Sequence, residues 1–231
     1  MTKDSKKRIV FHVGGPAFHP VAEQAALISN WLGDANDCRI LESLSAFESL
    51  DDCDLLVLMG LFWTGMKPNT EGRSVHQPMQ PRHREAFESY IVSGRPLLAH
   101  HGSVASYDDW PRFGELAGVT WVWGTTKHSP IDNHKVRVLG TGHPVIKGIA
   151  DYTITDELYY DLKLTPGLNM AVHAEADWNG RSQPMVLTAE GGRAPGAGKL
   201  AYLANGHDMR AFECPAMKQL WCNTVEWLTG S

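Results

Sequence analysis

Short apolar runs alternate with longer amphipathic stretches in the first hundred residues of the chain. The apolar runs predict buried strands at residues 8–13, 38–41, 54–59 and 96–99. Helical spacing of apolar residues predicts helices at 20–32 and 81–93, with a short helical stretch at 44–50 and a polar loop at 68–80. Strands that alternate with helices in this way favour a parallel sheet covered by helices on both faces.

The second half of the chain is richer in strands. Further strands are predicted at 119–123, 136–139, 152–155, 169–173, 183–188 and 199–203, and a closing helix at 215–228. The glycine-rich segment 189–198 fits a hairpin loop better than a phosphate-binding loop, because a strand follows where that motif needs a helix. We therefore expect one α/β domain over residues 1–231, a three-layer sandwich with a mostly parallel central sheet and an antiparallel extension.

Charge and composition exclude several classes of protein. The 231 residues carry a net charge of −5, and the largest basic cluster is Lys6-Lys7-Arg8, so we expect no nucleic-acid partner. No apolar stretch reaches the ~20 residues of a membrane span, and the polar start of the chain lacks the apolar core of a secretory signal. We expect a cytoplasmic protein with no membrane partner. The sequence leaves open whether the protein forms a homo-oligomer.

Three turns that carry histidines each follow a predicted strand. His19 follows the first strand, His100 and His101 follow the strand at 96–99, and His207 follows the strand at 199–203. Because the carboxyl ends of parallel strands lie along one edge of a sheet, these histidines are expected to share one site.

The remaining histidines have simpler interpretations. His12 and His173 are expected to be hydrogen-bonded core residues, and His143 to be structural. The others are predicted to be solvated, and they are His76, His83, His128 and His134.

With these segments placed, the chain resembles the ThuA-like family of trehalose-utilisation proteins. The likeness is carried by residues 142–149 (GHPVIKGI), 155–160 (TDELYY) and 198–208 (GKLAYLANGHD), with the closing helix ending in 225–227 (VEW). The resemblance implies a flavodoxin-like fold related to class I glutamine amidotransferases. It also implies a role near disaccharide or keto-sugar metabolism.

The chain departs from the glutaminases at the position of their nucleophile. Aligned with them, His101 stands where the cysteine nucleophile would be, and none of the four cysteines lies at a predicted strand-to-helix elbow. Amide hydrolysis through a thioester is therefore not expected. Ser103 is expected to cap a helix rather than act as a nucleophile.

An acidic turn and several aromatic residues complete the predicted site. Asp156 is expected to cap a helical turn, and Glu157 to be an acid in the pocket. Trp63 and Trp110 are the tryptophans predicted for the binding wall, with Tyr107 nearby, because aromatic planes stack on the C–H faces of sugar rings.

These features predict a carbohydrate-processing enzyme that acts on a disaccharide, glycoside or keto-sugar by acid–base chemistry of histidines and carboxylates. The predicted catalytic residues are His101, His207, Glu157 and Asp208, and the predicted substrate-binding residues are His19, Trp63, His100 and Tyr159. Two alternatives stay open. One is a sugar-binding or accessory module without turnover, and the other is a hydrolase that depends on a divalent metal held by His101, Glu157 and His207.

Overall fold

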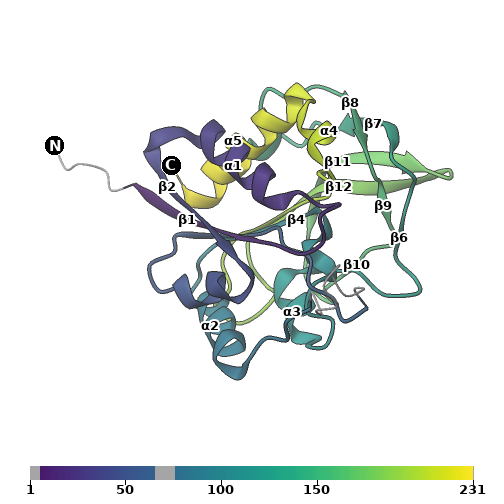
Figure 1. Cartoon of the computed structure of the whole chain (residues 1–231). Coiled ribbons are helices and arrows are strands. Elements are labelled where there is room, and N and C mark those ends of the chain that lie inside the picture. The colour runs from purple at the N-terminus through teal and green to yellow at the C-terminus, as the bar shows by residue number, and fades with distance from the viewer. Residues whose placement is uncertain (1–5, 66–75, 231) are drawn as a thin grey trace.

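The computed structural model describes residues 6–65 and 76–230. Most of the predicted polar loop at 68–80, and the polar start of the chain, lie outside these residues. The described chain is built around a nine-stranded sheet with the order β2-β1-β3-β4-β13-β12-β11-β7-β8 (Figure 1).

One half of the sheet is parallel. Its strands are β2 (Asn36–Glu42), β1 (Lys7–Val13), β3 (Leu55–Leu58), β4 (Leu97–His100) and β13 (Leu200–Leu203). Each neighbouring pair among these five strands is parallel. Strands β3, β4 and β13 are buried at every position, as expected for parallel strands covered on both faces. Their carboxyl ends therefore meet at one edge of the sheet.

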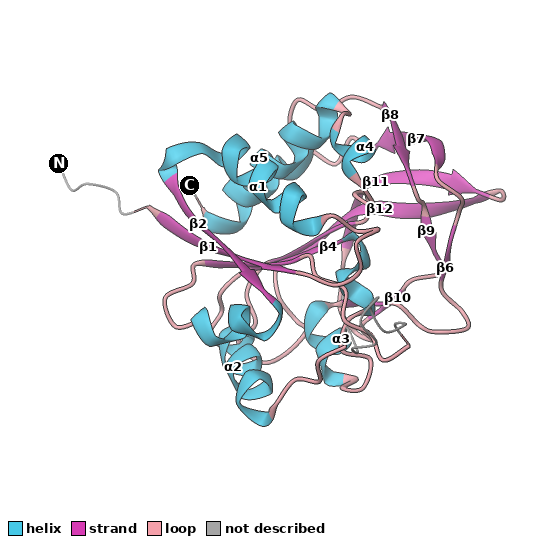
Figure 2. Cartoon of the chain, in the orientation of Figure 1, coloured by secondary structure: helices cyan, strands magenta, loops and turns pink. Residues whose placement is uncertain are grey.

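Helices cover both faces of the parallel half (Figure 2). Helices α1 (Val21–Leu32) and α5 (Pro215–Thr229) pack on one face, and α2 (Pro81–Val92) and α3 (Arg112–Ala117) lie on the other. Successive side chains of a strand point to opposite faces, so Ile9 and Phe11 join the α1/α5 core and Val10 joins the α2 core. The remaining helical segments are η1 (Gly33–Ala35), η2 (Ser43–Ser49), η3 (His101–Ala105), η4 (Pro144–Ile146) and α4 (Met209–Phe212).

The other half of the sheet is antiparallel. It consists of β12 (Arg181–Ala189), β11 (Ala171–Trp178), β7 (Asp132–Val138) and β8 (Tyr152–Asp156). Two small ladders pair β5 (Val119–Thr120) with β10 (Lys163–Leu164), and β6 (Lys127–His128) with β9 (Tyr159–Tyr160). The predicted α/β fold with an antiparallel extension is confirmed. The hairpin loop is confirmed too, since β12 and β13 are antiparallel partners.

Two details of the sequence prediction need correction. The strand expected at 119–123 ends at Thr120, because the backbone of Trp121 turns away to donate to the Val104 carbonyl. His83 and His134 are buried instead of solvated: His83 forms a capping box with Gln80, and His134 bonds the Ser129 hydroxyl. His12 and His173 are hydrogen-bonded core residues, as predicted.

Candidate functional site

Four polar side chains from four separate turns converge at the carboxyl edge of the sheet. His19 lies in the loop after β1, His101 directly after β4, Glu157 directly after β8, and His207 after β13. One nitrogen or carboxylate oxygen from each of the four lies within 4.8 Å of the others. We call these four residues the His3Glu cluster.

His101 is held in a sharp turn that aims its ring into the cluster. Its backbone has a left-handed φ of 42°, a conformation that histidine tolerates better than most residues. Its Nδ1–H donates to the Ala204 carbonyl at 2.7 Å, which leaves Nε2 unprotonated and with a free lone pair. That Nε2 is buried, lies 3.9 Å from Glu157 Oε2, and has no hydrogen-bond partner among the described residues. Burial lowers the pKa of His101 to about 3, so the ring is neutral at pH 7.

Two glycines allow the histidine turns to approach each other closely. Gly206 has a φ of 134°, and a Cβ there would lie 2.1 Å from His100 Nε2. A Cβ on Gly102 would lie 2.7 Å from His19 Cε1. A side chain at Gly206 would clash with His100 and one at Gly102 would clash with His19, so either would push the histidine turns apart.

Asp156 fixes the turn that carries His207. Its Oδ2 accepts from Gly206 N at 2.7 Å and from Asn205 Nδ2 at 3.1 Å, and its Oδ1 accepts from His207 N at 2.9 Å. Burial raises the pKa of Asp156 to about 6, against the opposing effect of these hydrogen bonds. The sequence prediction of a helix cap was wrong, because Asp156 ends a strand and holds a turn from another part of the chain.

Replacing Asp156 with asparagine tests this positioning role. One acceptor oxygen becomes an NH2 group, which leaves buried N–H donors of the 205–207 turn unpaired at about 1–3 kcal/mol each. Removing the buried charge, whose pKa is raised to about 6, offsets part of this loss, so we expect Asp156→Asn to lower the free energy of unfolding at pH 7 by about 1 kcal/mol in urea denaturation. Asp132→Asn, at an exposed position, should change it by less than about 0.5 kcal/mol. Equal stability of the two variants would contradict the role.

Glu157 links the cluster to a fifth histidine. Its Oε2 lies 3.1 Å from His207 Nδ1, and its Oε1 lies 3.1 Å from His128 Nδ1. Burial alone would raise the pKa of Glu157, but the hydrogen bonds to His128 and His207 outweigh it and hold that pKa well below its usual range. The same hydrogen bond raises the pKa of His128, whose side chain is half exposed. The sequence predicted His128 as a solvated residue and did not predict its pairing with Glu157.

His19 completes the cluster through contacts with His207 and His101. Its Nε2 lies 2.9 Å from His207 Nδ1, and its ring meets the rings of His101 and His207 edge to face. Burial is the largest cause that holds the pKa of His19 well below its usual value, and the neighbouring His101 and His207 lower it further. His19 is therefore neutral at pH 7.

A cavity of about 420 Å³ opens above the cluster. Its walls are largely aromatic and include Phe18, Trp63, Trp121, Trp123 and Tyr159. The rings of Trp63 and Trp123 stack with centroids 3.5 Å apart. The Tyr159 ring lies against His101 at a centroid distance of 4.1 Å. His19, His128, Glu157 and His207 also line the cavity.

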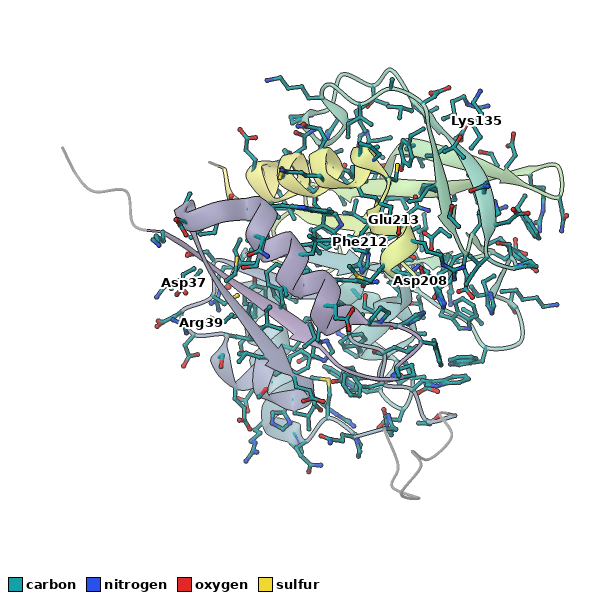
Figure 3. The ribbon with its side chains drawn as sticks, turned by 45° about the horizontal axis from the view of Figure 1, so that its top comes forward. Asp37, Arg39, Lys135, Asp208, Phe212 and Glu213 are labelled. Carbon is teal, nitrogen blue, oxygen red and sulfur yellow. The ribbon has the colours of Figure 1, made fainter. Side chains whose placement is uncertain are left out.

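Several residues predicted for the site lie elsewhere. His100 is fully buried and packs against Phe212 and Trp221, so it does not line the cavity. Asp208, labelled in Figure 3, caps the start of α4. It accepts from the Arg210 backbone and pairs with the Arg210 guanidinium.

The aromatic residues after His101 and the cysteines also lie outside the cavity. Tyr107 is buried and bonds His12, and Trp110 packs against Phe87. Ser103 accepts from the His100 backbone, as expected of a cap. The cysteines are absent from the cavity wall, and burial raises the pKa of the Cys53 thiol to about 11.

Other wall residues were missed by the sequence prediction. Trp121, Trp123 and His128 come from one segment that was predicted as a strand and a loop. The one available signal was the Trp-Val-Trp alternation at 121–123, which places two large aromatic rings close together in the chain.

Comparison with known proteins fits this architecture. The sequence profile of the ThuA family, described as trehalose utilisation, matches residues 12–228. The chain belongs to the ThuA family. None of the curated proteins matches at a significant level.

Solved structures with the same fold include two ThuA-like proteins. The one from Parabacteroides merdae has a TM-score of 0.75 and 15% identity, over 97% of this chain and 90% of that one. The one from Bacteroides uniformis has a TM-score of 0.70 and 20% identity, over 96% of this chain and 91% of that one. A glutamine amidotransferase from Thermotoga maritima has a TM-score of 0.55 and 9% identity, over 98% and 100%. The ThuA fold is therefore related to that of the amidotransferases. In this chain, His101 occupies the turn after β4.

A membrane-spanning helix, long and apolar enough to cross a bilayer, is not found among residues 6–65 and 76–230.

Proposed function

We propose that the aromatic-walled cavity is the active site of a carbohydrate-processing enzyme. The observation that carries this proposal is the combination of a floor of histidines and one carboxylate with walls of tryptophan and tyrosine. The substrate class that we infer is a disaccharide, glycoside or keto-sugar. The ThuA family description, trehalose utilisation, supports the same class.

The walls suit a sugar ring. Sugars present C–H faces that stack on aromatic planes, and their hydroxyl groups need polar partners at the edges. The stacked pair Trp63 and Trp123 offers such a plane, and Trp123 is 42% exposed at the mouth of the cavity. A volume of about 420 Å³ lies within the usual range for a small-molecule pocket.

The floor suits proton transfer. Glu157 stays ionised at pH 7 and favours the protonated form of His128, which faces the cavity and so can donate a proton to a leaving oxygen. His19 lines the cavity and His101 is buried in the cluster, and both stay neutral and offer lone pairs. Glu157, His128 and the neutral imidazoles thus provide a general acid together with basic partners.

A cytoplasmic location and self-association of the chain stay predictions from the sequence.

Removing the aromatic plane tests the substrate class. We expect Trp63→Ala to weaken sugar binding by about tenfold, since an aromatic stacking contact contributes about 0.5–1.5 kcal/mol beyond its buried area. Isothermal titration with trehalose, other disaccharides and aryl glycosides measures this. Trp110→Ala is the matched control, because Trp110 lies outside the cavity. Equal affinities of the two variants, or no sugar binding by the unmodified protein, would contradict the proposal.

A further inference from the structure

We infer that the His3Glu cluster is a centre for one divalent transition-metal ion. The ligand atoms are His19 Nε2, His101 Nε2, His207 Nδ1 and a carboxylate oxygen of Glu157. The inferred role of the ion in carbohydrate chemistry rests on the proposed function. The metal centre itself rests on the geometry of the four side chains.

The spacing of the four ligand atoms fits a single small cation. Metal–ligand distances of about 2.0–2.2 Å in a tetrahedral site place neighbouring ligand atoms about 3.4 Å apart. Among these ligand atoms, the pairwise distances are 2.9 Å for His19 Nε2 to His207 Nδ1 and 3.1 Å for His207 Nδ1 to Glu157 Oε2. His101 Nε2 lies 3.9 Å from the same carboxylate oxygen. These three values lie on both sides of the tetrahedral spacing, and each of the four ligand atoms lies within 4.8 Å of the others, so small shifts of the side chains would bring them around one cation.

Hydrogen bonds alone do not satisfy these atoms. His207 Nδ1 faces both His19 Nε2 and Glu157 Oε2, yet a ring nitrogen has either one proton or one lone pair and cannot serve both contacts fully. His101 Nε2 is buried, points into the cluster and has no hydrogen-bond partner in the described part of the chain. Unpaired buried polar atoms are uncommon and costly. A cation at the centre would satisfy both nitrogens at once.

Backbone contacts around the cluster orient the ligands as metal sites require. A ligating histidine usually donates its other ring N–H to a carbonyl or carboxylate, which fixes its tautomer. His101 does this through Nδ1–H to the Ala204 carbonyl. The Asp156 carboxylate fixes the turn of His207 by accepting from the backbone N–H groups of Gly206 and His207.

The donor set indicates which cation the centre would take. Three imidazoles and one carboxylate suit Zn²⁺ and its first-row neighbours, whereas Mg²⁺ and Ca²⁺ prefer oxygen ligands throughout. His19, Glu157 and His207 also line the cavity, so one side of the centre faces the space for substrate. A sugar hydroxyl or keto oxygen entering from the cavity could then be polarised by the cation. With the four residues engaged as ligands, His128 is the cavity group left to move a proton.

Metal loading of the purified protein tests the inference directly. The purified protein is stripped with a chelator, dialysed, and titrated separately with Zn²⁺, Mn²⁺ and Mg²⁺ by calorimetry, with bound metal counted by elemental analysis. We expect one equivalent of Zn²⁺ or Mn²⁺ and no stoichiometric Mg²⁺. Glu157→Gln and His101→Asn should each weaken binding by more than about 100-fold, beyond the ~10–100-fold loss typical of an outer-shell partner. His128→Gln should keep one equivalent, since His128 lies outside the cluster.

Loading with Co²⁺ separates a lost ligand from a lost fold. Circular dichroism checks that each variant is folded, and the visible absorption of bound Co²⁺ reports a four- or five-coordinate nitrogen and oxygen site. The inference is overturned if the stripped protein takes up no transition metal, or if folded Glu157→Gln and His101→Asn bind metal as the unmodified protein does. Sugar titration of the metal-free protein is an independent readout: sugar binding without any metal binding would reject the centre and leave the proposed function standing.

Discussion

Acidification from pH 7 to pH 5 will lower the free energy of unfolding by at least about 3 kcal/mol, because His12 and His100 stay neutral in the folded chain and the buried His19 and His101 act in the same direction. Burial lowers the pKa of both His12 and His100 to about 3, from the usual 6.5. At pH values between about 3 and 6.5, these two histidines are protonated in the unfolded chain and neutral in the folded chain. The stabilising effect is therefore complete above pH 6.5 and is lost progressively as the pH falls toward about 3.

The size of the effect follows from linkage. Each histidine contributes about 2 kcal/mol at pH 5, which is about 1.5 units below the unfolded pKa at roughly 1.4 kcal/mol per unit. Asp156 acts in the opposite direction, because burial raises its pKa from 3.8 to about 6 and its folded form takes up a proton first. That offset is about 1.4 kcal/mol at pH 5. The remaining loss is a large share of the 5–15 kcal/mol typical of a domain, so unfolding should begin at mildly acidic pH.

Urea unfolding at pH 7, 6 and 5 measures this dependence. His12→Gln removes one titrating group, so below pH 6 its unfolding free energy should fall less steeply, by about 1.4 kcal/mol per pH unit. A chain that is equally or more stable at pH 5 than at pH 7 would show that these histidines are not held neutral.

Replacing His101 with asparagine will lower turnover by at least about 100-fold, as expected when a catalytic acid, base or ligand is lost. Asparagine tolerates the left-handed backbone of His101 and can donate its side-chain N–H to the Ala204 carbonyl. It has no atom at the position of Nε2. The substitution therefore removes the buried lone pair and keeps the turn.

His143→Asn is the matched control. His143 lies outside the cavity, and its side chain accepts from Val145 N at the start of η4, a position where asparagine is also a favoured cap. We expect its turnover to be unchanged. If His101→Asn keeps full turnover while folded, His101 takes no part in the chemistry.

The sequence could predict the order of the elements and the edge of the sheet at which the histidines meet. Apolar runs such as 54–59 and 96–99 identify strands buried on both faces, because few polar residues interrupt them. A turn that directly follows such a strand must lie at its carboxyl end. The sequence therefore predicts that His19, His101 and His207 lie at one edge of the sheet.

Directions of side chains were harder to predict. His100 ends β4 and packs into the helical core, whereas His101 is the residue at which the chain reverses. Strand alternation predicts that the two rings diverge, but sequence alone does not tell which one joins His19, Glu157 and His207 in the cluster. Asp208 has the position of an N-cap before α4, and the capping preference of aspartate was a signal for a structural role.

The cavity walls depend on tertiary contacts that no local pattern shows. Trp123 reaches Trp63 across 60 residues of sequence, and His128 meets Glu157 because β6 pairs with β9. A two-residue ladder such as β6–β9 leaves almost no periodic signal in the sequence. These residues could not be assigned to the site without the fold.

Conversion of carbohydrates by the purified protein tests the central claim most directly. The protein, loaded with Zn²⁺ or Mn²⁺, is incubated with a panel of disaccharides, glycosides and their keto derivatives, and the products are followed by NMR. We predict turnover of at least one sugar by the unmodified protein and its loss in Glu157→Gln, with Glu115→Gln, an exposed position outside the floor of the cavity, unaffected. Turnover that persists in Glu157→Gln, or a complete absence of turnover across the panel, would contradict an active site at the His3Glu cluster.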